Sequence, residues 1–178
     1  MLDVAQKIRP LKPPAGSGQQ DNSTKVYPWR AYLREFLANP NHGAEYADVI
    51  GLHPYRSQQD AHDDRDFALS VYDQIYDARG IRKEYDAQDP FWVTEVGVSA
   101  GGTGPTAVAG ETEQAKKLTT VYTKLRELGV PTVVIHRMVN TTSGTNAWSD
   151  NIGVLGSSFG RKPAYCSLAA ARGYSLCQ

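Results

Sequence analysis

The chain has 178 residues, which is enough for one compact domain with a hydrophobic core. The chain has 19 basic residues (lysine and arginine) and 19 acidic residues (aspartate and glutamate), so its formal net charge is +0. This balance provides no large field of one sign to attract nucleic acid or an anionic membrane. No apolar run approaches the ~20 residues of a membrane span, and the N-terminus lacks a signal-peptide pattern.

The first part of the chain is predicted to be a short helix and a linker. Met1–Ile8 has the spacing of an amphipathic helix, and prolines and glycines interrupt residues 10–27. Helical spacing of apolar residues resumes in Trp29–Ala38. We therefore predict an N-terminal helix and linker over 1–28 and one folded domain over 29–178.

A short apolar strand followed by a helix then occurs three times. The predicted strands are Val49–Leu52, Phe91–Thr94 and Thr132–Ile135. The first of the three predicted helices carries Phe67, Val71 and Ile75 on one side. The second begins at about Glu111, and the third begins near Pro163. Connecting loops are predicted at Gly80–Asp89 and Gly129–Pro131. Strands and helices that alternate in this way indicate βαβ units and a parallel sheet.

Reactive side chains follow all three predicted strands. His53 and Tyr55 follow the first, Glu95 follows the second, and His136 and Arg137 follow the third. Because the carboxyl ends of parallel strands form the active-site edge of α/β folds, these residues are candidate site residues. Glu95 follows a buried strand, where a carboxylate is costly unless it is hydrogen-bonded or solvated. It is therefore either an arginine-paired structural residue or a nucleophile or general base.

Three segments carry a family resemblance: Ala47–Tyr55, Trp92–Gly97, and Ile152–Leu155 leading to Lys162–Tyr165. In their order and spacing they resemble the retaining clan A glycoside hydrolases, in particular the cellulase-like and xylosidase-like members of families 5 and 39. The similarity extends from about Trp29 to Arg172. The resemblance implies an α/β fold that is the C-terminal portion of a (β/α)8 TIM barrel, with parallel strands and outer helices.

The resemblance also implies a function, a carbohydrate substrate and no cofactor or metal. Glu95 would be the nucleophile that forms a glycosyl-enzyme intermediate, and Tyr55 would donate a hydrogen bond that keeps it ionised. His53 would lie beside Tyr55 in the site. Trp148 would be an aromatic platform for a sugar ring, or it would only cover the barrel mouth. His136 and Arg137 would bind substrate or anchor the rim.

The chain departs from the clan in its acid/base. Retaining hydrolysis needs a second carboxyl group about 5 Å from the nucleophile, and the clan carries it in an Asn-Glu motif on the fourth strand. No Asn-Glu dipeptide occurs in the sequence, and the first four or five strands have no counterpart. We therefore expect a fragment or a truncated form that is inactive alone. Its open sheet edges would favour self-association. Localisation stays open, with secretion expected only of a longer form.

Two other functions remain open. One is a non-catalytic carbohydrate-binding remnant that keeps His53, Tyr55 and Trp148. The other is an unrelated α/β enzyme that uses Glu95 with His53 or His136 as a base. No Gly-x-Ser-x-Gly elbow is present, which argues against a serine hydrolase.

Three further patterns have weaker interpretations. Gly102–Ala107 is similar to a dinucleotide fingerprint, but helical spacing begins only near Glu111, so a loop over the site is favoured. Asp60–Asp66 matches no metal-binding spacing and is predicted to be a solvated helix start. Cys166 and Cys177 could form a disulfide only if the chain turns back near Gly173, and the sequence leaves their pairing open.

Overall fold

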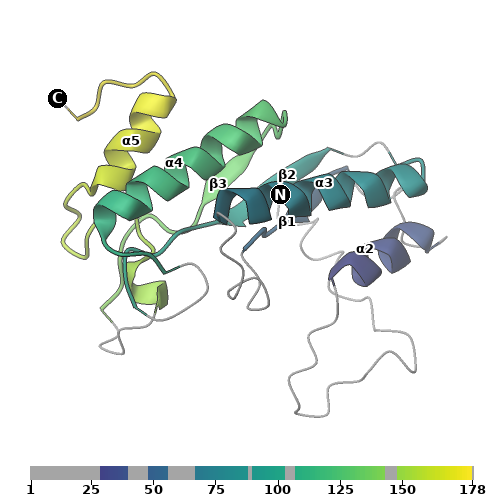
Figure 1. The fold of residues 1–178 in the computed structure, drawn as a ribbon, viewed down its shortest axis with the longest axis horizontal. Coiled ribbons are helices and arrows are strands. Elements are labelled where there is room, and N and C mark those ends of the chain that lie inside the picture. The colour runs from purple at the N-terminus through teal and green to yellow at the C-terminus, as the bar shows by residue number, and fades with distance from the viewer. Residues whose placement is uncertain are drawn as a thin grey trace, which may run out of the picture. The chain divides into compact units, whose positions relative to one another are not determined.

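A three-stranded sheet is the centre of the computed structural model, which describes residues 29–39, 48–55, 67–87, 90–102, 107–142 and 148–177. The strands are β1 (Ile50–Leu52), β2 (Phe91–Val96) and β3 (Val133–Ile135), and their order in the sheet is β1-β2-β3 (Figure 1). Strands β2 and β3 are parallel, with Val93 opposite Val133 and Val96 opposite Ile135. All three predicted strands are therefore present, within one or two residues of their predicted ends.

A helix follows each strand, as the sequence predicts: α3 (Phe67–Glu84) after β1, α4 (Glu111–Glu127) after β2, and α5 (Pro163–Ala171) after β3. Helix α2 (Trp29–Ala38) precedes β1, and the 3-10 helix η3 (Trp148–Asn151) lies between β3 and α5. Helix α4 begins with Glu111 and Glu113, whose negative charges favour a helix N-terminus. Helix α5 begins with Pro163, which lacks the amide hydrogen that a first turn leaves unbonded. The predicted beginnings of both helices are confirmed.

Helix α3 corrects one prediction. The loop expected over Gly80–Asp89 is wrong for its first part, because the helix continues through Gly80 to Glu84. Ala78 and Ile81 are buried and continue the apolar spacing, whereas Gly80 lies on the exposed side. The free energy gained by burying Ile81 outweighs the ~1 kcal/mol that a glycine costs inside a helix.

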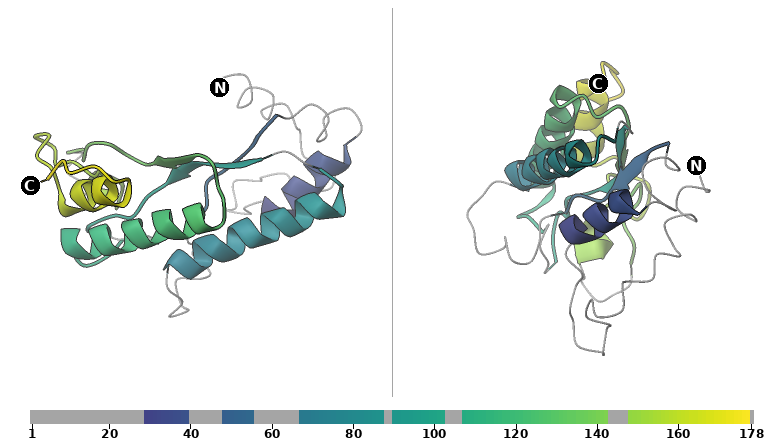
Figure 2. Two further views of the ribbon diagram at one scale, coloured as in Figure 1. Left: turned by 90° about the horizontal axis from the view of Figure 1, so that it is seen from above. Right: turned by 90° about the vertical axis from the view of Figure 1, so that its right-hand side faces the viewer.

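The hydrophobic core lies between the sheet and helix α4. Leu118, Val121 and Leu125 of α4 pack with Val93 and Val96 of β2, and all five are fully buried. Helices α4 and α5 lie side by side, and α4 runs along one face of the sheet (Figure 2). The opposite face is more open, because Val134 of β3 is 48% exposed. This agrees with the exposed interior expected of a partial barrel.

Contacts between Cα atoms divide the chain into two units. One contains residues 1–50 and 76–90, and the other contains residues 51–75 and 91–178. In the first unit, Arg34 of α2 forms a bidentate pair with Glu84, at 2.9 and 3.0 Å. Every residue of the candidate site belongs to the second unit.

A disulfide bond between Cys166 and Cys177 closes the C-terminal region of the second unit. Helix α5 ends at Ala171, and Gly173 adopts a positive φ of 81° that a residue with a side chain rarely adopts. The Tyr174 amide donates to the carbonyl of Ala169, so the chain reverses there. The Cα atoms of the two cysteines are consequently 5.5 Å apart, and the pairing that the sequence left open is present.

Several predictions lie outside the described residues. They are the N-terminal helix and linker over 1–28, the Asp60–Asp66 cluster and the middle of the Gly102–Ala107 loop. The domain boundary at residue 29 and self-association through open edges stay predictions. Among the helices that the structure describes, none is long and apolar enough to cross a membrane.

Candidate active site

The site lies where the strands of the sheet end. His53, Pro54 and Tyr55 directly follow β1, Glu95 is the next-to-last residue of β2, and His136 directly follows β3. Because these strands are neighbours in the sheet, their ends bring the side chains together.

The Glu95 carboxylate is the centre of this group. Its Oε1 atom accepts a hydrogen bond from the Tyr55 hydroxyl at 2.7 Å. Its Oε2 atom lies 3.9 Å from Nδ1 of His53 and 3.9 Å from Nδ1 of His136. The side chain is 31% exposed, so the carboxylate is accessible to a ligand. One oxygen is thus fixed by a phenol, and the other faces two imidazoles.

Tyr55 is held in place as a hydrogen-bond donor to Glu95. The carbonyl of Tyr55 accepts a hydrogen bond from the Gln74 side chain of α3 at 2.8 Å, which fixes its backbone. Burial raises the pKa of the Tyr55 phenol, and the hydrogen bond to Glu95 and its negative charge raise it further. The phenol therefore keeps its proton at neutral pH and donates a hydrogen bond to the carboxylate oxygen.

Trp148 packs against the ring of Tyr55. The two rings meet edge to face, with centroids 6.1 Å apart and planes inclined by 66°. This is a favourable aromatic geometry, and it connects η3 with the residue that holds Glu95.

Arg137 is directed to the loop after β3. Its guanidinium donates to the Thr141 hydroxyl at 3.0 Å, and that hydroxyl donates to the buried Asp150 of η3 at 2.9 Å. The arginine charge still lowers the pKa of Tyr55, against the larger effect of burial. The structure thus brings Glu95, Tyr55, His53 and His136 together, with Trp148 against Tyr55. Arg137 instead donates a hydrogen bond to Thr141.

Glycine allows the close approach of β2 to the segment after β3. A Cβ atom on Gly97 would lie 2.2 Å from the carbonyl oxygen of His136 and 2.6 Å from the side chain of Ile152. The His136 amide donates to the Val96 carbonyl at 2.8 Å. Gly97 therefore sets the distance between the strand that bears Glu95 and the imidazole that faces it.

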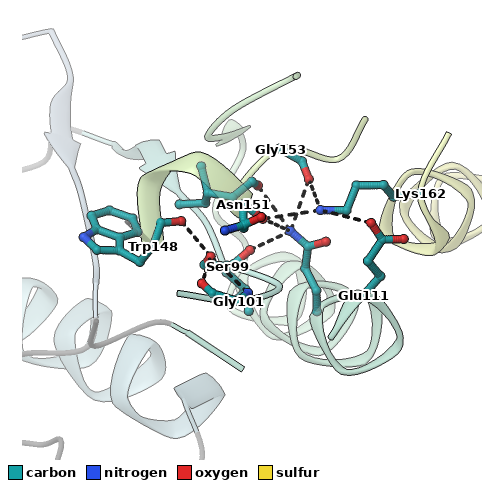
Figure 3. Close-up of polar contacts among 10 residues, drawn as sticks. Ser99, Gly101, Glu111, Trp148, Asn151, Gly153 and Lys162 are labelled. Atoms are coloured by element: carbon teal, nitrogen blue, oxygen red, sulfur yellow. Dashed lines mark hydrogen bonds and ion pairs between the residues drawn. The ribbon is translucent and has the colours of Figure 1, made fainter. Parts of the chain in front are cut away.

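A buried polar group beneath the site was not predicted. Ser99, Gln114 and Lys162 are 0%, 0% and 3% exposed, and their polar atoms contact backbone carbonyls of residues 148–153 (Figure 3). Lys162 belongs to a segment that carries the family resemblance, but the resemblance implies no role for its side chain. The sequence signal that could have identified it is a lysine immediately before an N-terminal helix proline.

The arrangement can provide an oriented, partly exposed carboxylate for nucleophilic attack or for proton abstraction. The groups in contact with it are a phenol and two imidazoles, and none of these three is a carboxyl group. Within the described residues, no group of three or more histidine, cysteine, aspartate or glutamate side chains could hold a metal ion.

Comparisons with known proteins support the fold. No protein-family model matches the chain, and no curated protein matches it. Among solved structures, an active-site mutant of the Rhizomucor miehei β-1,3-glucanosyltransferase, determined with laminaritriose, matches at a TM-score of 0.53 and 16% identity. The match covers 72% of this chain and 46% of that one.

Two further structures match comparably. A family 39 glycoside hydrolase from Bacteroides cellulosilyticus WH2 has a TM-score of 0.53 and 25% identity, over 75% of this chain and 28% of that one. A family 2 β-galacturonidase from Eisenbergiella tayi has a TM-score of 0.54 and 19% identity, over 74% and 25%. The chain thus spans less than half the length of each. The predicted fold, the C-terminal portion of a (β/α)8 barrel, is confirmed.

Proposed function

We propose that this chain carries the nucleophile of a retaining glycoside hydrolase, with Glu95 as that nucleophile. The single observation that supports this most is the 2.7 Å hydrogen bond from Tyr55 to Glu95 at two neighbouring strand ends. The solved structures of similar fold are glycoside hydrolases and a glucanosyltransferase, and they belong to different families. The narrower likeness to the cellulase-like and xylosidase-like families 5 and 39 is part of this proposal.

In the proposed reaction, a Glu95 oxygen forms a bond to the anomeric carbon while the glycosidic carbon–oxygen bond breaks. The electron pair of that bond leaves with the departing oxygen. The Tyr55 phenol holds Glu95 at the rotamer required for attack. His53 and His136 face the second carboxylate oxygen and stand where ring hydroxyls would bind. Trp148 stacks on the apolar face of a sugar, and Arg137 lines the rim.

The departing oxygen needs a proton unless it is already a stable anion. Retaining enzymes take this proton from a carboxyl group about 5–5.5 Å from the nucleophile. Within the part of the chain that the structure describes, the side chains that face Glu95 are those of Tyr55, His53 and His136, and none is a carboxyl group. We therefore propose that this chain performs only the glycosylation step, and only on sugars with activated leaving groups.

Covalent trapping tests the assignment. The chain is incubated with 2,4-dinitrophenyl 2-deoxy-2-fluoro glucoside and xyloside, whose leaving groups need little protonation, and is then analysed by intact-mass and peptide mass spectrometry. We expect one fluorosugar on Glu95, none in Glu95→Gln, and slower labelling in Tyr55→Phe. Glu113→Gln is the matched control, because the exposed fractions of the two carboxylates are similar, 36% for Glu113 and 31% for Glu95. Label on any other residue would refute the proposal.

A second function is favoured by the same three contacts. Because none of the described contacts of Glu95 is a carboxyl group, the proposed second function is that the site binds a carbohydrate and does not cleave it. Titration with laminaritriose and cellotriose, followed by tryptophan fluorescence, measures binding. Release of dinitrophenolate measures cleavage. Binding that is lost in Trp148→Ala, together with no release above background, would establish the binding function and exclude the catalytic one.

A further inference from the structure

Three buried polar side chains hold the turn that carries Trp148. Ser99 follows β2, Gln114 belongs to α4, and Lys162 immediately precedes α5. We infer that these residues, the backbone clamp, are positioning residues that fix the Trp148 indole beside Tyr55 for stacking on a sugar ring. The inference about the sugar rests on the proposed function, whereas the inference about the position of Trp148 does not.

The clamp holds both ends of the turn. The Ser99 hydroxyl lies 2.6 Å from the Trp148 carbonyl and 2.7 Å from the Gly101 carbonyl. At the other end, the Lys162 ammonium donates to the Gly153 carbonyl at 2.8 Å and to the Asn151 carbonyl at 3.3 Å.

Gln114 lies between these two ends. Its side-chain nitrogen is 2.8 Å from the Val98 carbonyl and 3.2 Å from the Gly153 carbonyl. It is also 3.3 Å from the carbonyls of Asn151 and Ile152. One amide group thus connects the segment after β2 with the segment after η3, so the two segments cannot move independently.

Burial makes these contacts demanding. A 3-10 helix of four residues leaves its last carbonyl groups without partners inside the helix, and a buried carbonyl without a donor costs free energy. A buried ammonium also needs several acceptors. Burial lowers the pKa of Lys162, and the Glu111 carboxylate, 3.9 Å away, opposes this shift. The Gln114 carbonyl oxygen is buried without a hydrogen-bond partner in the described part of the chain, so the clamp acts through its donors, which contact carbonyl groups at both ends of the turn.

The clamp lies on one side of the turn, and the candidate site lies on the other. In Figure 3 the Trp148 carbonyl points to Ser99, while its indole points away from the clamp. The indole contacts Tyr55, whose hydroxyl donates to Glu95. A continuous series of contacts therefore joins the clamp to the carboxylate. A binding residue is effective only when neighbouring groups lock its orientation.

Fluorine NMR of the chain labelled with 5-fluorotryptophan tests the clamp. The chain has three tryptophans, and the Trp148→Phe variant assigns the Trp148 resonance. We expect Ser99→Ala to shift or broaden the Trp148 resonance and to leave those of Trp29 and Trp92 in place. Thr119→Val is the matched control, because Thr119 has a buried hydroxyl without a hydrogen-bond partner in the described part of the chain. It should move none of the three.

Two outcomes decide the inference. An unchanged Trp148 resonance in Ser99→Ala, with the other two also unchanged, would overturn it. If Ser99→Ala changes all three resonances, the variant has lost its fold, and Lys162→Met is judged by the same criterion instead. Methionine keeps most of the apolar packing of the lysine side chain and lacks its hydrogen-bond donor.

Laminaritriose is then added to the wild-type chain and to Ser99→Ala. We expect the variant to bind about tenfold more weakly, since displacement of a positioned group by 1 Å can cost up to a hundredfold. A wild-type chain that does not respond to either laminaritriose or cellotriose would contradict the proposed function and leave the resonance test valid. A wild-type chain that binds as weakly as Ser99→Ala would contradict the role of the clamp in sugar binding.

Discussion

Adding one methyl group at Gly97 is expected to destabilise the chain strongly. The new Cβ atom would lie 2.2 Å from the His136 carbonyl oxygen, whereas carbon–oxygen contacts are normally about 3.3 Å or longer. The overlap is thus about 1 Å, and the obstacle is backbone that the His136–Val96 hydrogen bond holds in place. Overpacking of this kind costs about 1–3 kcal/mol, and we expect Gly97→Ala to reach the upper end.

Gly80→Ala adds the same methyl group where nothing lies within 4 Å. Inside helix α3 it should stabilise the chain by about 0.5–1 kcal/mol, because alanine loses less backbone entropy than glycine. The two variants should therefore differ by about 3.5–4 kcal/mol in the free energy of unfolding. Urea unfolding followed by circular dichroism measures this difference, with equal m-values required for the comparison. Coincident midpoints for the two variants would show that the close contact between β2 and the segment after β3 is not a packing constraint.

Two further predictions concern Tyr55 and the disulfide. Burial and Glu95 raise the pKa of Tyr55 above its ordinary value of 10.0, so the stability that this shift contributes is present below about pH 10 and is lost above it. Urea unfolding between about pH 9 and 11 should therefore show a smaller loss of stability in Tyr55→Phe than in the wild type, and equal losses would contradict this. Replacing Cys166 and Cys177 by serine should lower the unfolding free energy by about 2–3 kcal/mol, since the bond joins residues separated by 11 positions. Dithiothreitol should lower the unfolding free energy of the wild type by the same amount and leave that of the serine variant unchanged. An effect of dithiothreitol on the serine variant would refute the explanation.

The sequence predicted the parts of the fold that depend on local pattern. Apolar runs identified all three strands, the helical spacing of apolar residues identified where α4 begins, and Pro163 identified where α5 begins. Parallel strands place their carboxyl ends together, so the meeting of Tyr55, Glu95 and His136 followed from topology. Their proposed roles in catalysis remain to be tested by trapping.

The parts that depend on distant contacts could not be predicted. Gly80 indicated a loop, whereas the helix continues to Glu84 because Ile81 is buried. That burial depends on the tertiary structure, so the local sequence pattern does not predict it. The three members of the clamp are separated in sequence, and each is an ordinary polar residue until the fold surrounds it with carbonyl groups. The pairing of Cys166 with Cys177 required the reversal at Gly173, which the sequence allowed but did not demand.

The covalent link at the C-terminus affects how the protein should be prepared. Disulfides form in oxidising compartments and are kept reduced in most cytosols. Material from a cytosolic expression host would therefore have the same sequence with an untied tail, and helix α5, which follows Lys162 directly, would lose its tether. Preparations with and without the disulfide would then differ in their free energy of unfolding although their sequences are identical. Titration of free thiols in each preparation would identify the cause.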